Sequence, residues 1–213
     1  MTVRRILVVT AVQAERDAFE RGLADLPADA RAAVTLLVGG VGPAAVAAST
    51  AMTLAREPHD AVVSAGIGGA FSHAARIGDV LVADRIIAAD LGADGPEGFQ
   101  SVEELGFGTA TVAATPLDGL KTLAVRGDLL TVTTATGTAE RAKWLRDRYP
   151  GAIGEAMEGY GVAMAATRLG LPVAELRAVS NLVGPRDRSA WRIGEALAAL
   201  TAAAGPAVEG LMA

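Results

Sequence analysis

The sequence has no cysteine, and only two of its 213 residues are histidines, His59 and His73. The absence of cysteine excludes disulfide bonds, thiolate metal sites and cysteine nucleophiles. Two histidines are too few for a histidine-rich metal centre, and we expect both at the surface. We therefore expect neither a metal nor an organic cofactor, and acid–base chemistry is left to the 24 aspartates and glutamates.

Positive charge is also scarce, because 19 lysines and arginines against 24 acidic residues leave a net charge of −5. Binding to nucleic acid depends on positive charge, so we expect no nucleic-acid partner. Residues 32–55 are uncharged and long enough to cross a bilayer, but glycines and Pro43 interrupt them and favour a strand, a turn and a helix. Charged residues 15–17 closely follow the first apolar run, so we expect no signal peptide, no membrane contact and a cytoplasmic protein.

Short apolar runs alternate with longer alanine-rich stretches along the whole chain. The runs predict strands at 5–10, 33–38, 60–65, 79–90, 129–136, 154–157 and 172–180. The longer stretches predict helices at 14–26, 43–56, 138–149, 158–170 and 189–204, with a loop at 91–108. Continuously apolar strands that alternate with helices indicate an α/β protein with a mostly parallel sheet covered on both faces. The length favours a single domain over residues 1–213.

Polar side chains follow several of these strands at the point where each strand ends. Glu15 comes after the first strand, Glu158 after the short strand at 154–157, and Asn181 after the last. Because ligands bind beyond the carboxyl ends of such strands, we expect these residues to converge. Glu15 could instead stabilise a helix dipole, and Asn181 could cap the next segment. Glu158 lies in an otherwise uncharged stretch, where a carboxylate is better explained by ligand hydroxyls.

Two glycine-rich segments and one buried arginine are more ambiguous. Residues 40–45 match the dinucleotide pattern G-x-G-x-x-A, but the acidic residue expected later is misplaced, so a tight turn is favoured. The segment GIGG at 66–69 is interpreted as a turn whose backbone N–H groups, around Ile67 and Gly68, could hold an anion or a ribose. Arg177 lies inside a buried strand and needs an anionic partner.

Five segments in a fixed order carry a resemblance to a known superfamily. They are AVQAERDAF, SAGIGGAF, IGDVLVAD, EAMEGYGVA and LRAVSN. In this order they resemble the purine nucleoside phosphorylase and methylthioadenosine nucleosidase superfamily over nearly the whole chain. Asn181 in place of the usual aspartate, the stretch NLVGPRDRSAW and residues 89–108 are most similar to the futalosine hydrolase family within it.

The resemblance implies a fold, an activity and a substrate. The fold would be a three-layer α/β/α sandwich around a mixed, partly barrel-like sheet, and the protein would be a homo-oligomer, a dimer or a tetramer. The activity would be hydrolysis of the N-ribosidic bond of futalosine in menaquinone biosynthesis, with release of hypoxanthine. The partner is then a small-molecule nucleoside.

The resemblance also implies roles for individual residues. Glu15 would activate the water, and Glu158 would accept hydrogen bonds from the ribose hydroxyls. Asn181 would donate to a 6-oxo group and accept from a protonated N7, a pattern that suits hypoxanthine and fits adenine poorly. The sugar and the same wall of the site would be bounded by Met157, Arg177 and Ser180.

Alternatives remain at the level of the sequence. The carboxyphenyl ketone tail of futalosine would need a cation and apolar walls, for which Arg186, Arg188, Trp191 and Phe99 are candidates. A purine nucleoside phosphorylase or a methylthioadenosine/adenosylhomocysteine-type nucleosidase would share the same scaffold. A nucleoside-binding protein without catalysis is an alternative of another class, although binding alone does not need a water-activating glutamate.

Overall fold

The computed structural model describes residues 3–212. The predicted domain over 1–213 extends past this range by residues 1–2 and 213, which lie outside the described residues. The strands are β1 (Ile6–Thr10), β2 (Val34–Val38), β3 (Ala61–Ala70), β4 (Val80–Ala88), β5 (Gly92–Gly95), β6 (Gly98–Ser101), β7 (Thr111–Ala113), β8 (Ala124–Thr131), β9 (Ala152–Ala156) and β10 (Val173–Leu182). The helices are α1 (Gln13–Gly22), α2 (Ala28–Ala32), α3 (Pro43–Arg56), α4 (Ala139–Arg148), α5 (Gly159–Thr167) and α6 (Ile193–Met212), with short 3-10 turns η1 (Asp118–Leu120) and η2 (Arg188–Ala190).

The main sheet is mixed and partly closed. Its strands follow the order β10-β4-β8-β9-β3-β1-β2, and β3 also pairs with β10, so β3, β10, β4, β8 and β9 form a ring. The pairs β1–β2, β1–β3, β3–β10, β4–β8 and β8–β9 are parallel, whereas β4–β10, β3–β9 and β4–β7 are antiparallel. This arrangement confirms the mixed, partly barrel-like sheet that the family resemblance implies.

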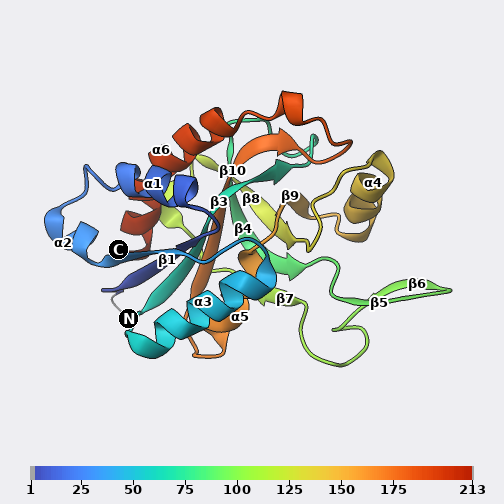
Figure 1. Ribbon diagram of the computed structural model, residues 1–213, viewed down its shortest axis with the longest axis horizontal. Coiled ribbons are helices and arrows are strands. Elements are labelled where there is room, and N and C mark those ends of the chain that lie inside the picture. The colour runs from blue at the N-terminus through green and yellow to red at the C-terminus, as the bar shows by residue number, and fades with distance from the viewer. Residues whose placement is uncertain (1–2, 213) are drawn as a thin grey trace.

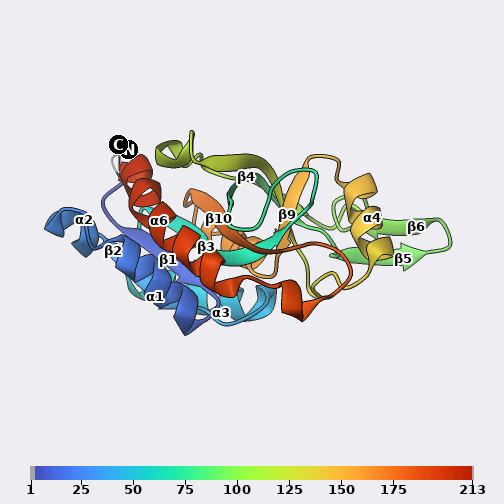
Figure 2. The ribbon, with the colours of Figure 1, turned by 90° about the horizontal axis from the view of Figure 1, so that it is seen from above.

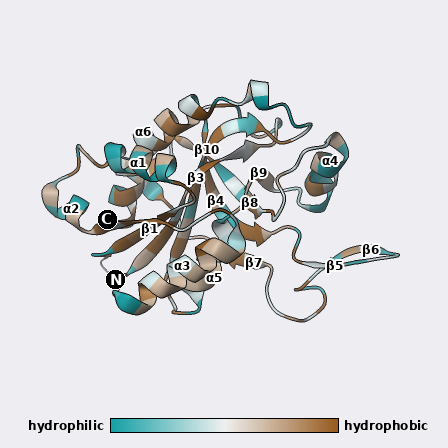
Figure 3. Ribbon diagram, viewed as in Figure 1, coloured by the Kyte–Doolittle hydropathy of each residue, from teal (hydrophilic) through white to brown (hydrophobic). Residues whose placement is uncertain are grey.

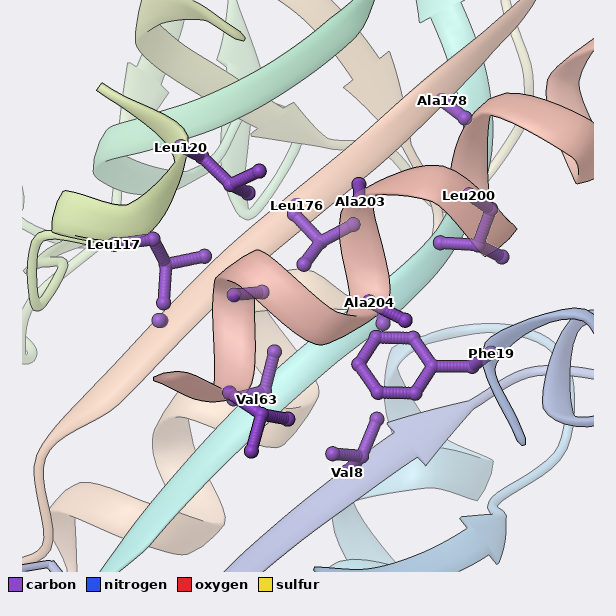
Figure 4. Close-up of a cluster of buried hydrophobic side chains, with 14 of the residues drawn as sticks. Val8, Phe19, Val63, Leu117, Leu120, Leu176, Ala178, Leu200, Ala203 and Ala204 are labelled. Carbon is purple, nitrogen blue, oxygen red and sulfur yellow. The ribbon is translucent and has the colours of Figure 1, made fainter. Parts of the chain in front are cut away.

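Helices cover both faces of the sheet, as Figures 1 and 2 show. On one face, Phe19 of α1 and Leu200 of α6 pack on Val8 and Val63 of the strands beneath them (Figure 4). On the other face, α3 and α5 pack against alternate residues of the same strands, including Leu7 of β1. Each central strand is therefore buried on both sides, which explains why it reads as a continuous apolar run (Figure 3).

A third, smaller cluster lies at the far end of the sheet, where α4 packs on β8 and β9 through Leu145, Leu130 and Ala152. Beyond it, β5 and β6 form a hairpin that projects from the body of the molecule (Figures 1 and 2). The prediction of a loop at 91–108 is therefore wrong for residues 92–101. Residues 91–98 are all exposed, so no alternation of buried and exposed residues marks the first of these strands.

The structure corrects three further predictions. The segment 66–69 is not a turn but the continuation of β3. The strand predicted at 129–136 is β8, which ends at Thr131, and residues 132–138 form the loop between β8 and α4. His59 is buried, with 6% of its surface exposed, whereas His73 is exposed as expected. Among the described residues, no helix is both long and apolar enough to cross a membrane, and 32–55 forms β2, a turn and α3.

Candidate active site

A cavity of about 330 Å³ lies where β1, β3, β9 and β10 end. Seven of the nine residues predicted for the site line it, namely Glu15, Ile67, Gly68, Met157, Glu158, Ser180 and Asn181. Residues separated by up to 166 positions in the chain thus share one cavity, because the strands that carry them all end at the same rim.

Glu15 is buried, and backbone N–H groups hold its carboxylate in place. Its Oε2 accepts from the N–H groups of Ala11 (2.9 Å) and Val12 (3.2 Å), at the start of α1. Its Oε1 accepts from the N–H of Ile67 in β3 at 2.9 Å. A carboxylate offers about four acceptor positions, so these three bonds leave one for a water or a ligand. Glu15 therefore both accepts hydrogen bonds at the start of α1 and keeps an acceptor position for a ligand in the cavity.

The glycines of 66–69 explain how β3 can pass beside this group. A Cβ atom on Gly66 would lie 2.6 Å from Glu15 Oε1 and 2.7 Å from Arg177 Nη1. Glycine is therefore needed at position 66 so that the strand, Glu15 and Arg177 can approach closely. The N–H of Ile67 binds the protein's own Glu15 carboxylate, and the binding of a ligand anion or a ribose by this segment stays a prediction.

Glu158 is held from the opposite direction by the turn after β2 and by Arg177. Its Oε1 accepts from the N–H of Gly42 (3.2 Å), and its Oε2 accepts from Arg177 Nη1 (3.2 Å). Gly40 and Gly42 have φ values of 95° and 89°, which favour glycine. The G-x-G-x-x-A segment is thus a tight turn that holds Glu158, as the sequence favoured.

Arg177 is 1% exposed and is shared between two carboxylates. Its Nε donates to Glu175 Oε1 at 2.9 Å, and its Nη2 donates to Ser64 Oγ at 2.7 Å. Burial by itself lowers the pKa of Arg177, but the charges of Glu175, Glu158 and Glu15 outweigh it, so the pKa is raised and the side chain stays cationic. Burial raises the pKa of Glu175, although Arg177 opposes this. Arg177 lies behind the cavity wall and positions Glu158.

Asn181 extends from β10 beside Ser180. The Ser180 hydroxyl donates to Asn181 Oδ1 at 2.9 Å, and Asn181 Nδ2 donates to the carbonyl of Leu182 at 3.2 Å. An amide has two donor hydrogens and two acceptor positions, so one of each remains available to a ligand.

Of the four residues that the sequence offers for binding the tail of a substrate, two line the cavity and two do not. Arg186 and Trp191 line the cavity, whereas Arg188 belongs to the exposed turn η2. Phe99 lies on β6, where it packs edge-on against Trp144 with ring centroids 5.6 Å apart. Phe99 does not line the cavity, because it lies on the projecting hairpin.

Glu155 and Glu175 are two buried carboxylates that the sequence analysis missed. Glu155 lies at the end of β9, lines the cavity and is bonded to Thr136. A charged residue within an otherwise apolar strand is the signal in the sequence that points to both of them. Among residues 3–212, no group of three or more His, Asp or Glu side chains is arranged to hold a metal.

Comparison with known proteins gives concordant results. The family model described as the phosphorylase superfamily matches residues 10–209. A futalosine hydrolase of Streptomyces coelicolor is 53% identical, over 94% of this chain and 93% of its own. One of Acidothermus cellulolyticus is 49% identical, over 92% and 87%. The solved 5′-methylthioadenosine/S-adenosylhomocysteine nucleosidase of S. pneumoniae, bound to a transition-state inhibitor, is 20% identical with a TM-score of 0.80, over 98% of this chain and 99% of its own.

Proposed function

Because the chain belongs to the futalosine hydrolase family of the phosphorylase superfamily, we propose that it hydrolyses futalosine and releases hypoxanthine through Glu15, Glu158 and Asn181. It is a nucleoside hydrolase, and its place in menaquinone biosynthesis follows from that substrate. The observation that carries the mechanism is the Glu15 carboxylate, which three backbone N–H groups fix in the cavity with one acceptor position left.

Cleavage of the N-ribosidic bond builds positive charge on the anomeric carbon. In the proposed reaction, Glu15 orients a water and takes its proton while the water oxygen bonds to that carbon. The electron pair of the broken bond leaves with the base, which takes up a proton. Glu158 accepts from the ribose hydroxyls, and its charge favours the cationic sugar.

The charge of the site supports water rather than phosphate as the acceptor. Glu15, Glu158 and Glu175 surround a single buried cation, Arg177. Phosphate would meet three carboxylates in the cavity, Glu15, Glu155 and Glu158, against one lining cation, Arg186. Arg85, which lies within β4, pairs with Asp128 and does not line the cavity.

The cavity also supports recognition of the futalosine tail. Arg186 and Trp191 both line it, and they supply a cation and an apolar wall for a carboxyphenyl group. If this is their role, kcat/KM for futalosine exceeds that for tail-less inosine, and Arg186→Ala reduces the difference. Equal specificity constants for the two substrates would remove the need for a tail subsite.

We further propose a homo-oligomer, a dimer or a tetramer. An apolar cavity of about 250 Å³ beside α3 and α5, with Leu91 exposed at its edge, is a surface that a second copy would cover. Light scattering of the purified protein tests this, and a monomer at micromolar concentration would refute it.

The test of the activity is incubation with futalosine, inosine or methylthioadenosine, with and without phosphate. We expect free hypoxanthine and free ribose product, and no sugar phosphate. Glu15→Gln is expected to abolish turnover while substrate binding persists. Glu20→Gln on the exposed side of the same helix is the matched control, and it should leave turnover unchanged. Full activity of Glu15→Gln would refute the mechanism.

A further inference from the structure

Glu155 is a buried carboxylate in the cavity that neither water activation nor sugar binding uses. It is 7% exposed. Its Oε1 accepts from the backbone N–H of Thr136 at 2.7 Å, and its Oε2 accepts from the Thr136 hydroxyl at 2.6 Å. A carboxylate has about four acceptor positions, so about two remain open toward the cavity.

The charge of Glu155 has no direct counter-ion within the described part of the chain. None of the ion pairs found over residues 3–212 includes this side chain, in contrast to Glu158 and Glu175, which share Arg177. A buried carboxylate with open acceptor positions is unfavourable unless a donor satisfies it. The cavity itself is the remaining place from which a donor can come.

The strand register places Glu155 opposite Asn181 across a glycine. Gly69 of β3 pairs with Asn181 of β10 on one side and with Glu155 of β9 on the other. Neighbouring strands lie about 4.8 Å apart, so roughly 10 Å separates the backbones of Glu155 and Asn181.

Gly69, which lies between them in the sheet, contributes no side chain of its own. A Cβ atom on Gly69 would lie 3.0 Å from Val183 Cγ2 and 3.1 Å from Asn181 Nδ2. The glycine leaves room for the Asn181 side chain, and the cavity that Gly69, Asn181 and Glu155 all line has an amide at one edge and a carboxylate at the other.

The hydrogen-bond donors and acceptors that Asn181 and Glu155 offer can distinguish a 6-oxopurine from a 6-aminopurine. A 6-oxopurine carries an N1–H donor next to its O6 acceptor, whereas a 6-aminopurine carries an N1 acceptor next to an N–H donor. We propose that Glu155 selects the base: its carboxylate accepts the N1–H of a 6-oxopurine while Asn181 faces O6 and N7. An ionised carboxylate has no proton to donate to the N1 of adenine, so a lone pair of the Glu155 oxygen and the lone pair of N1 would repel each other. This inference rests on the proposed function, since it takes the cavity to hold the base.

The test compares inosine with adenosine as substrates of the wild type and of Glu155→Gln. A hydrogen bond to a charged group changes specificity by about 10- to 100-fold. We expect the ratio of kcat/KM for inosine to that for adenosine to fall by this factor, because the glutamine amide can donate to the N1 of adenine. Glu140→Gln, an exposed glutamate at the start of α4, is the matched control and should leave the ratio unchanged.

Thr136→Val separates base selection from a purely structural role. This variant removes a hydrogen bond to Glu155 but keeps the carboxylate, so it should lower kcat/KM for both substrates alike. If Glu155→Gln also lowers both alike, or if the two variants move the ratio equally, Glu155 only anchors the loop and the inference is overturned.

A binding measurement on the wild type does not depend on the folding of any variant. Calorimetry should show hypoxanthine binding at least about 10-fold more tightly than adenine and 1-methylhypoxanthine. Equal binding of hypoxanthine and 1-methylhypoxanthine would overturn the role of N1–H. Failure to release hypoxanthine from futalosine or inosine would instead refute the proposed function, so the two failures are distinguishable.

Discussion

Gly66→Ala is the substitution for which the structure predicts the sharpest separation of activity from folding. The added Cβ would lie 2.6 Å from Glu15 Oε1, about 0.8 Å closer than the 3.4 Å at which ordinary contact begins. It would also lie 2.7 Å from Arg177 Nη1. Glu15 cannot shift without loosening its bond to the N–H of Ile67, the residue next to the substitution.

The expected consequence is a misplaced carboxylate in a folded protein. A displacement approaching 1 Å at a reacting group can lower the rate by about 100-fold. Overpacking of this kind destabilises a protein by about 1–3 kcal/mol. We therefore expect kcat/KM for futalosine to fall by roughly 10- to 100-fold, with a decrease of a few kcal/mol at most in the free energy of unfolding.

Steady-state kinetics and urea unfolding of the same preparation measure both quantities. Gly194→Ala is the control, because a Cβ there would meet no atom within 4 Å. It should leave kcat/KM unchanged and should not lower the free energy of unfolding, because alanine favours a helix more than glycine does. A Gly66→Ala enzyme within about twofold of wild-type kcat/KM would refute the claim that the N–H of Ile67 and close strand approach fix Glu15 for catalysis.

Three other predictions concern the charges and the amide of the site. Asn181→Asp should shift preference from hypoxanthine toward adenine nucleosides by about 5- to 150-fold, and unchanged specificity constants would contradict the role of the amide. Arg177→Met should lower the free energy of unfolding by about 3–5 kcal/mol in urea, because it leaves two buried carboxylates without their cation. The loss should shrink at acidic pH, because burial raises the pKa of Glu175 and favours its neutral form. Burial raises the pKa of Glu155, so the folded protein holds this proton more tightly than the unfolded chain does. The free energy of unfolding of the wild type should therefore fall, relative to that of Glu155→Gln, as the pH rises through this raised pKa. The expected fall is about 1.4 kcal/mol for each pH unit by which the pKa of Glu155 in the folded protein exceeds that in the unfolded chain. A difference between the two proteins that does not change with pH would refute this.

Much of the architecture was predictable from local pattern alone. Most residues of a strand that is buried on both faces are apolar, so runs such as ILVV and AVVSA identify strands without any knowledge of their neighbours. Helix α3 begins at Pro43 and ends at Arg56, as predicted, because proline suits a first helical turn and the segment carries no charge before Arg56. The convergence of Glu15 and Asn181 followed from the rule about where parallel strands end, because β1, β3 and β10 are parallel neighbours, whereas Glu158 follows β9, which pairs antiparallel with β3.

The tertiary structure alone decided which side chains face one another. GIGG reads as a turn because glycines usually interrupt strands, yet β3 continues through it so that Glu15 and Arg177 can approach the backbone. Phe99 was expected at the site, but the hairpin that carries it projects elsewhere. Glu155 meets the cavity opposite Asn181 only because both pair with Gly69. Periodicity determines which residues are buried, since burial depends on local geometry, whereas register between distant strands determines their partners and therefore the chemistry of the site.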